Sequence, residues 1–222
     1  NPAAQDLIQQ TAEDKGTPLL LLATEMDEKD LALFSQFQGP IVVLDNRCPR
    51  FALNTVCIDN SMAGWAAGCC LISHGHRNVG FITSSIPFQN AVDRKKGFVE
   101  ALDTEGIVLP EKNIFSVTPT MEEATKELIQ IFSTRKELPT GIFAMNDILA
   151  FAAYRALQET KRRIPQDVSL IGMDNLPFGQ ILTPKLTTIG VYKEELGCRA
   201  VERLIEIVQN PETAPVKQSV SI

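Results

Sequence analysis

Polar side chains follow three apolar runs of the sequence, at the residue where each run ends. Asp45 comes after "VVL", Asn146 after "IFAM" and Asp174 after "LIGM". An amide both donates and accepts hydrogen bonds, and a carboxylate accepts two from adjacent hydroxyls. Arg94, in "AVDRKKGF", adds a planar fork of donors suited to a carboxylate, a phosphate or a pair of hydroxyls. Together these groups suit a polyhydroxylated ligand better than an apolar one.

Each of these residues also has a structural alternative. Asp45 and Asp174 can start turns, and Arg94 can pair with acids on a surface helix. In "FAMNDILAF", Asn146 or Asp147 can cap the helix that follows the apolar run, hold a ligand, or do both. Residue types alone leave these alternatives open.

The sequence favours a binding protein over an enzyme. It contains no GxSxG, HExxH, P-loop or GxGxxG motif. Its two histidines, His74 and His76, lie in one predicted loop and leave little for acid–base chemistry at neutral pH. A turn with a cation at a helix end explains "SHGH" better than a metal site does. We therefore expect no cofactor and no metal, although Asp45 and Asp174 leave a glycosidase-like carboxylate pair as a remote alternative.

These residues are placed by a regular alternation of short apolar runs and segments with helical spacing. Runs such as "PIVVLD", "NVGFIT" and "DVSLIGM" predict buried strands, and "DRKKGFVEALDTEG" predicts a helix that ends at Gly106. In "TMEEATKELIQIFSTR", Thr120 and Glu123 have the spacing of a capping box. Continuous apolar strands alternating with amphipathic helices predict parallel sheets covered on both faces. Ligands of such sheets bind beyond the carboxyl ends of the strands, where the polar residues fall.

The whole chain has the composition of an ordinary globular protein. Its 222 residues are 44% hydrophobic, and its longest apolar run, "PLLLLA", is too short to cross a bilayer. The net charge of −6 argues against these residues gripping a nucleic-acid backbone themselves. Five cysteines without metal-ligand spacing predict free thiols and a reducing, cytoplasmic location.

Several segments resemble, in order, the effector-binding core of the LacI/GalR family of bacterial transcription regulators. The matching segments are "VVLDNR", "VCIDNSMAGWAAGCCLISHGHRNVGFIT", "DRKKGFVEAL", "GIFAMNDILAFAAYRAL" and "IPQDVSLIGMDNLPFGQILTPKLTTI". The resemblance implies an α/β fold with two parallel-sheet subdomains joined by crossing strands, like the type I periplasmic binding proteins. It implies residues 1–59 and 190–215 in an amino-terminal subdomain, and residues 60–189 and 216–222 in a carboxy-terminal one.

The same resemblance assigns a ligand-binding role to six positions. It implies an effector cleft between the subdomains, lined by Asp45, Asn90, Arg94, Phe115, Asn146 and Asp174. Phe115 would stack on the ligand, with a core position as its alternative, and Phe178 would close the cleft or lie at a subunit contact. In this interpretation Asn146 contacts the ligand while Asp147 steadies its helix.

Two departures from the family limit these expectations. No helix-turn-helix headpiece precedes Asn1, so operator binding is expected only through a headpiece absent from this chain. The amino-terminal subdomain looks incomplete, because a strand and helix expected between "NPAAQDLIQQTAEDKG", a predicted helix, and "PLLLLA" have no room. The expected function is the effector-sensing core of a homodimeric regulator that binds a sugar or nucleoside. The alternative is a solute-binding protein of a sugar transporter.

Overall fold

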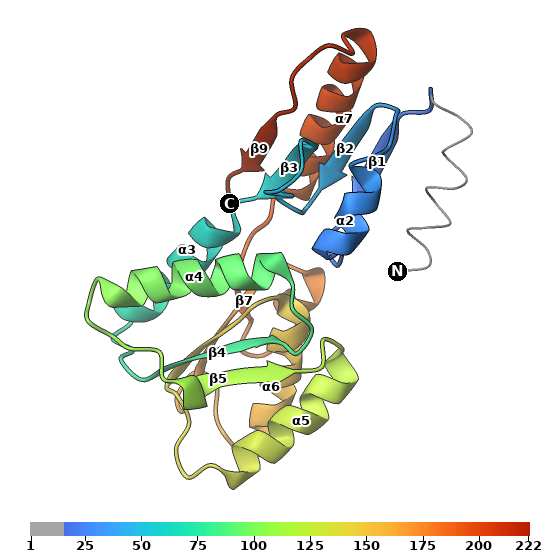
Figure 1. The fold of residues 1–222 in the computed structure, drawn as a ribbon. Helices are drawn as coiled ribbons and strands as arrows, with labels where there is room; N and C mark the ends of the chain where they lie inside the picture. The colour runs from blue at the N-terminus through green and yellow to red at the C-terminus, as the bar shows by residue number, and fades with distance from the viewer. Residues whose placement is uncertain (1–15) are drawn as a thin grey trace. The chain divides into compact units, whose positions relative to one another are not determined.

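The computed structural model of the protein describes residues 16–222. The predicted helix in residues 1–16 lies almost wholly outside the described residues. The chain divides into two compact units, shown as a ribbon in Figure 1. The amino unit contains the chain up to Asp59, residues Phe88–Asn90 and residues Tyr192–Ser221; the carboxy unit contains Asn60–Pro87 and Ala91–Val191.

The described part of the amino unit is a four-stranded parallel sheet in the order β1-β2-β3-β9. The strands are β1 (Leu19–Leu22), β2 (Ile41–Leu44), β3 (Asn54–Ile58) and β9 (Lys217–Val220). Helix α2 (Glu28–Phe34) packs through Phe34 against Leu21 and Val43 of this sheet. Helix α7 (Lys193–Gln209) contacts β2 and β3 and buries Leu196, Ala200 and Ile207.

Strand β9 corrects one predicted boundary. Residues 216–222 were expected in the carboxy-terminal subdomain, but β9 pairs in parallel with β3, with Val56 opposite Gln218. All of β9 therefore belongs to the amino unit. The short polar segment "KQSVSI" carries no periodicity that would have chosen between the two sheets.

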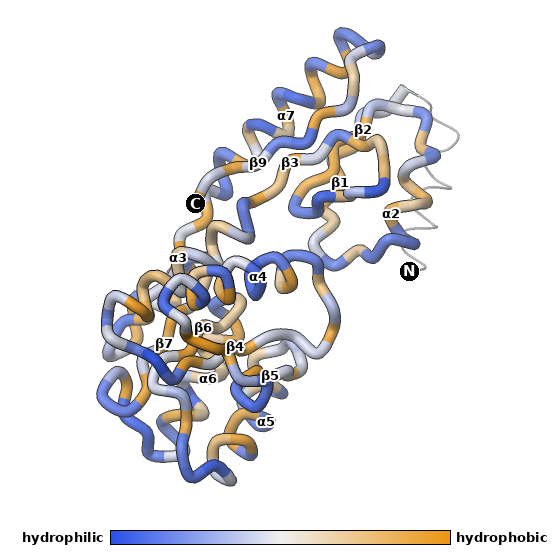
Figure 2. Tube along the Cα trace, turned by 60° about the vertical axis from the view of Figure 1, so that its left-hand side comes forward, coloured by the Kyte–Doolittle hydropathy of each residue, from blue (hydrophilic) through white to orange (hydrophobic). Residues whose placement is uncertain are grey.

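The carboxy unit is a five-stranded parallel sheet in the order β5-β4-β6-β7-β8. Its strands are β4 (Val79–Ser84), β5 (Ile114–Val117), β6 (Gly141–Ala144), β7 (Ser169–Met173) and β8 (Thr187–Ile189). Its helices are α3 (Asn60–Ser73), α4 (Gln89–Asp103, whose first two residues fall in the amino unit), α5 (Met121–Thr134) and α6 (Asp147–Glu159). The strands contain few polar residues, and the tube is orange where β4, β6 and β7 run together (Figure 2).

Helices cover both faces of this sheet (Figure 1). On one face, Phe98 of α4 packs against Phe81 of β4 and Phe143 of β6, with ring centroids 6.0 and 5.5 Å away. On the other, Phe132 of α5 packs edge-on against Phe115 of β5. This two-faced burial confirms the sheet type predicted from the apolar strands.

Two glycines let α3 and α4 approach one another closely. A Cβ on Gly64 of α3 would lie 1.9 Å from the carbonyl oxygen of Arg94, and one on Gly97 of α4 would lie 1.8 Å from that of Ser61. Any larger residue would force the helices apart. The small-residue composition of α3 therefore sets where α4 presents Arg94.

Candidate functional site

The carboxyl edge of the five-stranded sheet carries three of the six predicted site residues, Arg94, Asn146 and Asp174. Strand β6 ends at Ala144 and β7 ends at Met173, so Asn146 and Asp174 come just after two neighbouring strands. Because every strand of this sheet is parallel, these ends meet at one edge.

Arg94 is buried at this edge and has fixed partners. Its side chain is 5% exposed. Its Nε donates to Asn60 Oδ1 at 2.7 Å, and its Nη1 donates to the Met145 carbonyl at 2.6 Å. Asn60 is itself fully buried as the first residue of α3. The guanidinium is thus held beside the peptide that leads into Asn146, which brings two of the predicted site residues together.

Asn146 caps the helix that follows it. Its Oδ1 accepts a hydrogen bond from the Leu149 N–H at 2.9 Å, and its extended backbone, with φ −152°, is typical of an N-cap. The capping alternative is therefore confirmed. Ligand binding by its amide N–H groups stays a prediction compatible with the cap.

Asp147 is a supporting residue whose partners sequence reasoning missed. It is fully buried. Its carboxylate accepts from the Leu176 N–H at 2.7 Å and from the Thr188 hydroxyl at 2.6 Å. It was expected to steady its own helix, but it also ties α6 to the segment after β7 and to β8. Gly172 makes room for it, since a Cβ there would lie 2.2 Å from Asp147 Oδ1.

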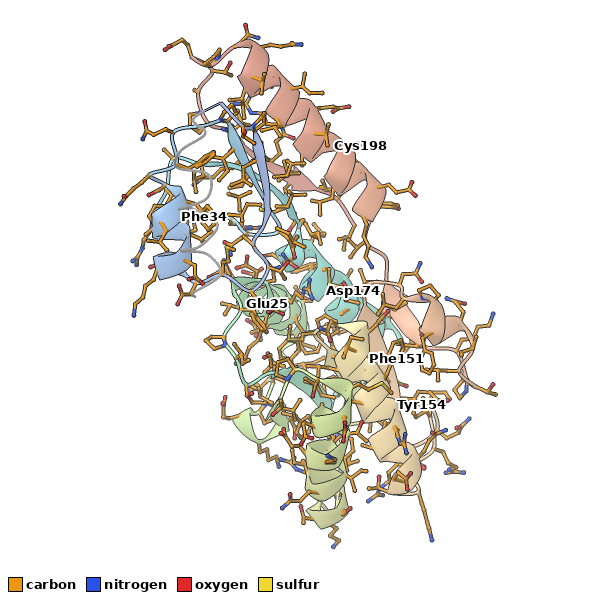
Figure 3. All side chains as sticks on the ribbon, turned by 90° about the vertical axis from the view of Figure 1, so that its right-hand side faces the viewer. Glu25, Phe34, Phe151, Tyr154, Asp174 and Cys198 are labelled. Atoms are coloured by element: carbon orange, nitrogen blue, oxygen red, sulfur yellow. The ribbon has the colours of Figure 1, made fainter. Side chains whose placement is uncertain are left out.

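Asp174 lies in the segment that Asp147 holds. Its N–H donates to the Ile189 carbonyl at 2.9 Å, and the next N–H, of Asn175, donates to Thr188 Oγ1 at 3.2 Å. Asp174 and Asn175 both have positive φ, 117° and 49°, as expected of residues that turn the chain sharply. Figure 3 shows Asp174 close to the end of α6 from which Phe151 projects. Asp174 as a whole residue is half-buried, at the same edge as Asn146.

Asp45 occupies the corresponding edge of the four-stranded sheet. It follows β2 with φ +58°, and its Oδ2 accepts a hydrogen bond from the Thr24 hydroxyl at 2.8 Å. Asn90 Nδ2 donates to the Asp45 carbonyl at 3.2 Å. The structure therefore brings Asp45 and Asn90 together. Thr24 was missed, although it follows the apolar run "PLLLLA" as Asp45 follows "VVL".

Phe115 lies in the core, and the expectation that it stacks on a ligand gains no support. It is 2% exposed and packs against Phe132 with ring centroids 5.7 Å apart. It is the second residue of β5, so its ring lies towards the amino end of that strand. Arg135 Cζ covers the ring at 4.9 Å from the centroid.

The histidine loop ends helix α3. His74 Nδ1 lies 2.8 Å from the Cys70 carbonyl, and Gly75 turns the chain with φ +82°. The predicted turn at the end of this helix is therefore confirmed. Within residues 16–222, no group of three or more His, Cys, Asp or Glu side chains could hold a metal ion.

The cysteines are free thiols. Burial raises the pKa of the Cys48 thiol to about 12 and that of Cys57 to about 11. Both groups are therefore protonated near neutrality and act as small apolar side chains rather than nucleophiles. No described helix is long and apolar enough to span a bilayer.

At the level of the fold, these two parallel α/β units define a periplasmic-binding-protein-like domain, and the family model of that description matches residues 70–222. The chain is 33% identical over 211 residues to the HTH-type transcriptional repressor PurR of Yersinia enterocolitica serotype O:8, covering 92% of this chain and 62% of that protein. The chain thus spans less than two thirds of the length of this curated relative.

Two solved structures have the same fold. A LacI family transcriptional regulator from Enterococcus faecium with bound ribose superposes with a TM-score of 0.81 at 27% identity, covering 98% of this chain and 80% of that one. The transcriptional regulator CelR in complex with cellobiose gives a TM-score of 0.88 at 24% identity, covering 98% and 67%. The chain therefore belongs to the periplasmic-binding-protein-like domain family, in the branch of the LacI/GalR transcriptional regulators.

Proposed function

We propose that this chain is the effector-sensing core of a LacI-type transcriptional repressor. The observation that carries the proposal is the buried Arg94, fixed by Asn60 and the Met145 carbonyl beside the capping residue Asn146. A buried guanidinium with fixed orientation suits recognition of adjacent hydroxyls better than a surface arginine does, because little side-chain entropy remains to be lost on binding.

The proposed ligand is a small polar molecule, a sugar or a nucleoside. Arg94 and the Asn146 amide would donate hydrogen bonds, and the carboxylates of Asp45 and Asp174 would accept them from hydroxyls. Asn90 supports Asp45 through the carbonyl contact. The E. faecium relative with bound ribose and the CelR relative with cellobiose support a sugar. No role in ligand binding is proposed for Phe115.

Regulation would follow from the ligand's differential affinity for two arrangements of the two units. A ligand that uses Asp45 and Asn90 together with Arg94 and Asp174 binds best when both sets are within its reach. It can shift the equilibrium only by the ratio of its affinities for the two arrangements. In a homodimer carrying headpieces, this shift would change operator affinity. A cytoplasmic location would fit this role.

The rival functions have less support. A solute-binding protein of a transporter has the same fold, but the 33% identical relative is a repressor. An enzyme that uses Asp45 and Asp174 also has less support, because the same relative is named as a transcriptional repressor. Steady ligand concentration over time in an NMR sample would count against turnover.

A thermal-shift screen of sugars, nucleosides and purine bases, followed by calorimetry, tests the proposal. Saturable binding that is lost in Arg94→Ala and Asp174→Asn is expected, because each removes a group proposed to touch the ligand. The matched control is Asp103→Asn, an exposed carboxylate near the end of α4 that should leave affinity unchanged. No binding across the panel, or equal binding by all three variants, would contradict the proposal.

A further inference from the structure

The amino edge of the five-stranded sheet holds a polar cavity. It has a volume of about 500 Å³ and lies where the chain enters three strands, with Asn78 before β4, Asn113 before β5 and Leu138 before β6. Parallel strands place their amino ends opposite their carboxyl ends, so this cavity is at the far edge from Arg94, Asn146 and Asp174. It is separate from the proposed effector site.

Positive charge predominates in the lining. Lys112, Arg135 and Lys136 contribute three cations, and Glu137 is the only carboxylate there. This excess stands out on a chain with a net charge of −6. Long-range attraction of anions to such a patch is strongest at low ionic strength.

The two lysines are available to a ligand. Both are exposed, and neither forms an ion pair with any residue in the described range 16–222. Lys126 on α5 differs, since its ammonium binds Glu122 and Glu123 at 2.9 Å each. An ammonium without a carboxylate partner can bind an anion without first breaking an ion pair.

Arg135 is positioned rather than free to rotate. Its guanidinium lies on the buried ring of Phe115, Nη1 donates to Asn113 Oδ1 at 3.5 Å, and Nη2 donates to the Lys112 carbonyl. A guanidinium has five N–H donors, so these two bonds leave others for a ligand. The contact of the guanidinium with the Phe115 ring, 4.9 Å from Cζ to the centroid, helps to hold this geometry.

Asn113 makes the wall behind Arg135 rigid. It is 3% exposed, and its Nδ2 donates to Asn78 Oδ1 at 3.1 Å and to the Val79 carbonyl at 3.0 Å. The chain therefore holds one planar cation on a buried polar support, in a cavity that two exposed lysines also line. These contacts distinguish the cavity from an exposed surface where charged side chains have no fixed position.

We propose that this cavity binds a small organic phosphate. The fork of Arg135 matches two phosphate oxygens, and Lys112 and Lys136 supply point charges for the remaining ones. The volume accommodates a phosphorylated sugar-sized molecule, within the range of small-molecule sites. The site would be a second input to the protein, independent of the neutral polar ligand proposed for the carboxyl edge.

Calorimetry of the 222-residue chain with ribose 5-phosphate at low salt tests the proposal. We expect saturable one-to-one binding, at least ten times weaker in Lys112→Gln/Lys136→Gln and in Arg135→Gln. The matched control is Lys96→Gln/Lys126→Gln, which removes the same charge from exposed lysines of the same unit and should change affinity less than twofold. Backbone amide NMR shifts should cluster at residues 112–113 and 135–137.

Unphosphorylated ribose and inorganic phosphate as probes separate the ligand's parts, and citrate tests whether any polyanion suffices. Tight binding by inorganic phosphate alone or by citrate would overturn the assignment to an organic phosphate. Absent binding, or equal weakening in the control pair, would overturn the site. Loss of ribose 5-phosphate binding in Arg94→Ala instead of the lysine pair would place it at the carboxyl edge and also overturn it. Each of these outcomes can still be interpreted if the effector proposal fails.

Discussion

The two edges of the five-stranded sheet use charge in different ways. At the carboxyl edge Arg94 and Asp147 are buried, and each binds groups from other elements. At the amino edge Lys112 and Lys136 are exposed, and only Arg135 is held by the protein. The same sheet thus has one edge at which charged groups are buried in the folded core and another at which the lysines are exposed and the arginine is half-buried.

This difference separates stability from recognition. A buried charge whose partner is removed costs the full desolvation of the group left behind, whereas an exposed charge keeps its water. Substitutions at the carboxyl edge should therefore lower the free energy of unfolding as well as ligand affinity. Substitutions of the exposed amino-edge lysines should change affinity alone. The variants below test this comparison, in order of decreasing effect.

Asp147→Ala should have the largest effect on stability. It leaves the Leu176 N–H and the Thr188 hydroxyl without their acceptor inside the protein, so we expect the free energy of unfolding to fall by about 3 kcal/mol. Urea denaturation measures this loss. Asp103→Ala, at an exposed carboxylate, is the control and should leave the urea midpoint unchanged. A loss below about 1 kcal/mol for Asp147→Ala would show that the edge tolerates an unpaired donor.

Arg94→Lys and Arg135→Lys form a matched pair across the two edges. Each keeps the charge and loses the planar fork. At Arg94 the loss of the paired bonds to Asn60 and Met145 should cost about 2 kcal/mol of unfolding free energy. At the half-buried Arg135 the loss should be below about 1 kcal/mol, because water can replace its contacts. Equal losses measured by urea denaturation would remove the distinction between the edges.

Asn146→Ala and Asn146→Asp separate the two roles of the capping residue. Alanine removes the acceptor for the Leu149 N–H and should cost about 1 kcal/mol. Aspartate keeps that acceptor and should retain stability, yet it replaces the amide donors offered to a ligand. Comparing urea midpoints with effector affinity tests both expectations. Retained affinity in Asn146→Asp would leave Asn146 with the capping role alone.

The arrangement of the carboxyl edge could be predicted from the sequence where the chain itself fixes it. The strand-then-helix alternation places Asn146 and Asp174 at strand ends, and the structure has both at one edge. The N-cap role of Asn146 is local, because its partner Leu149 lies three residues away. Local pattern and parallel topology were sufficient for these residues.

Longer-range partners could not be read in the same way. Asp147 binds groups 29 and 41 residues further along, and Thr24 binds Asp45 across 21 residues. Phe115 shows the limit for an aromatic, since a strand residue can face a ligand or a core and only tertiary packing decides. The same limit applied to β9, whose pairing with β3 no sequence period revealed.

The smallest predicted effect concerns pH at the amino edge. Burial, with a lesser contribution from His74, lowers the pKa of His76 below its ordinary value of 6.5. Its Nδ1 lies 3.0 Å from Thr140 Oγ1, and the Thr140 hydroxyl donates its proton to the Asn78 carbonyl at 3.1 Å. As pH falls through 6.5 the unfolded chain takes up a proton before the folded chain does, so stability should decrease. The decrease should be complete below the pKa of the folded state.

Urea midpoints at pH 7.5 and pH 5.5 measure this effect in the wild-type chain and in His76→Gln. Both pH values lie above the ordinary pKa of the carboxylates, so histidines and not carboxylates take up protons between them. The comparison of wild type with His76→Gln isolates the contribution of His76. The wild-type midpoint should fall more between the two pH values than that of His76→Gln, because glutamine takes up no proton. An equal fall of the midpoint in both proteins would mean that protonation of His76 does not change the free energy of unfolding. His76 would then behave like a histidine on the exposed surface, although it is half-buried in the structure.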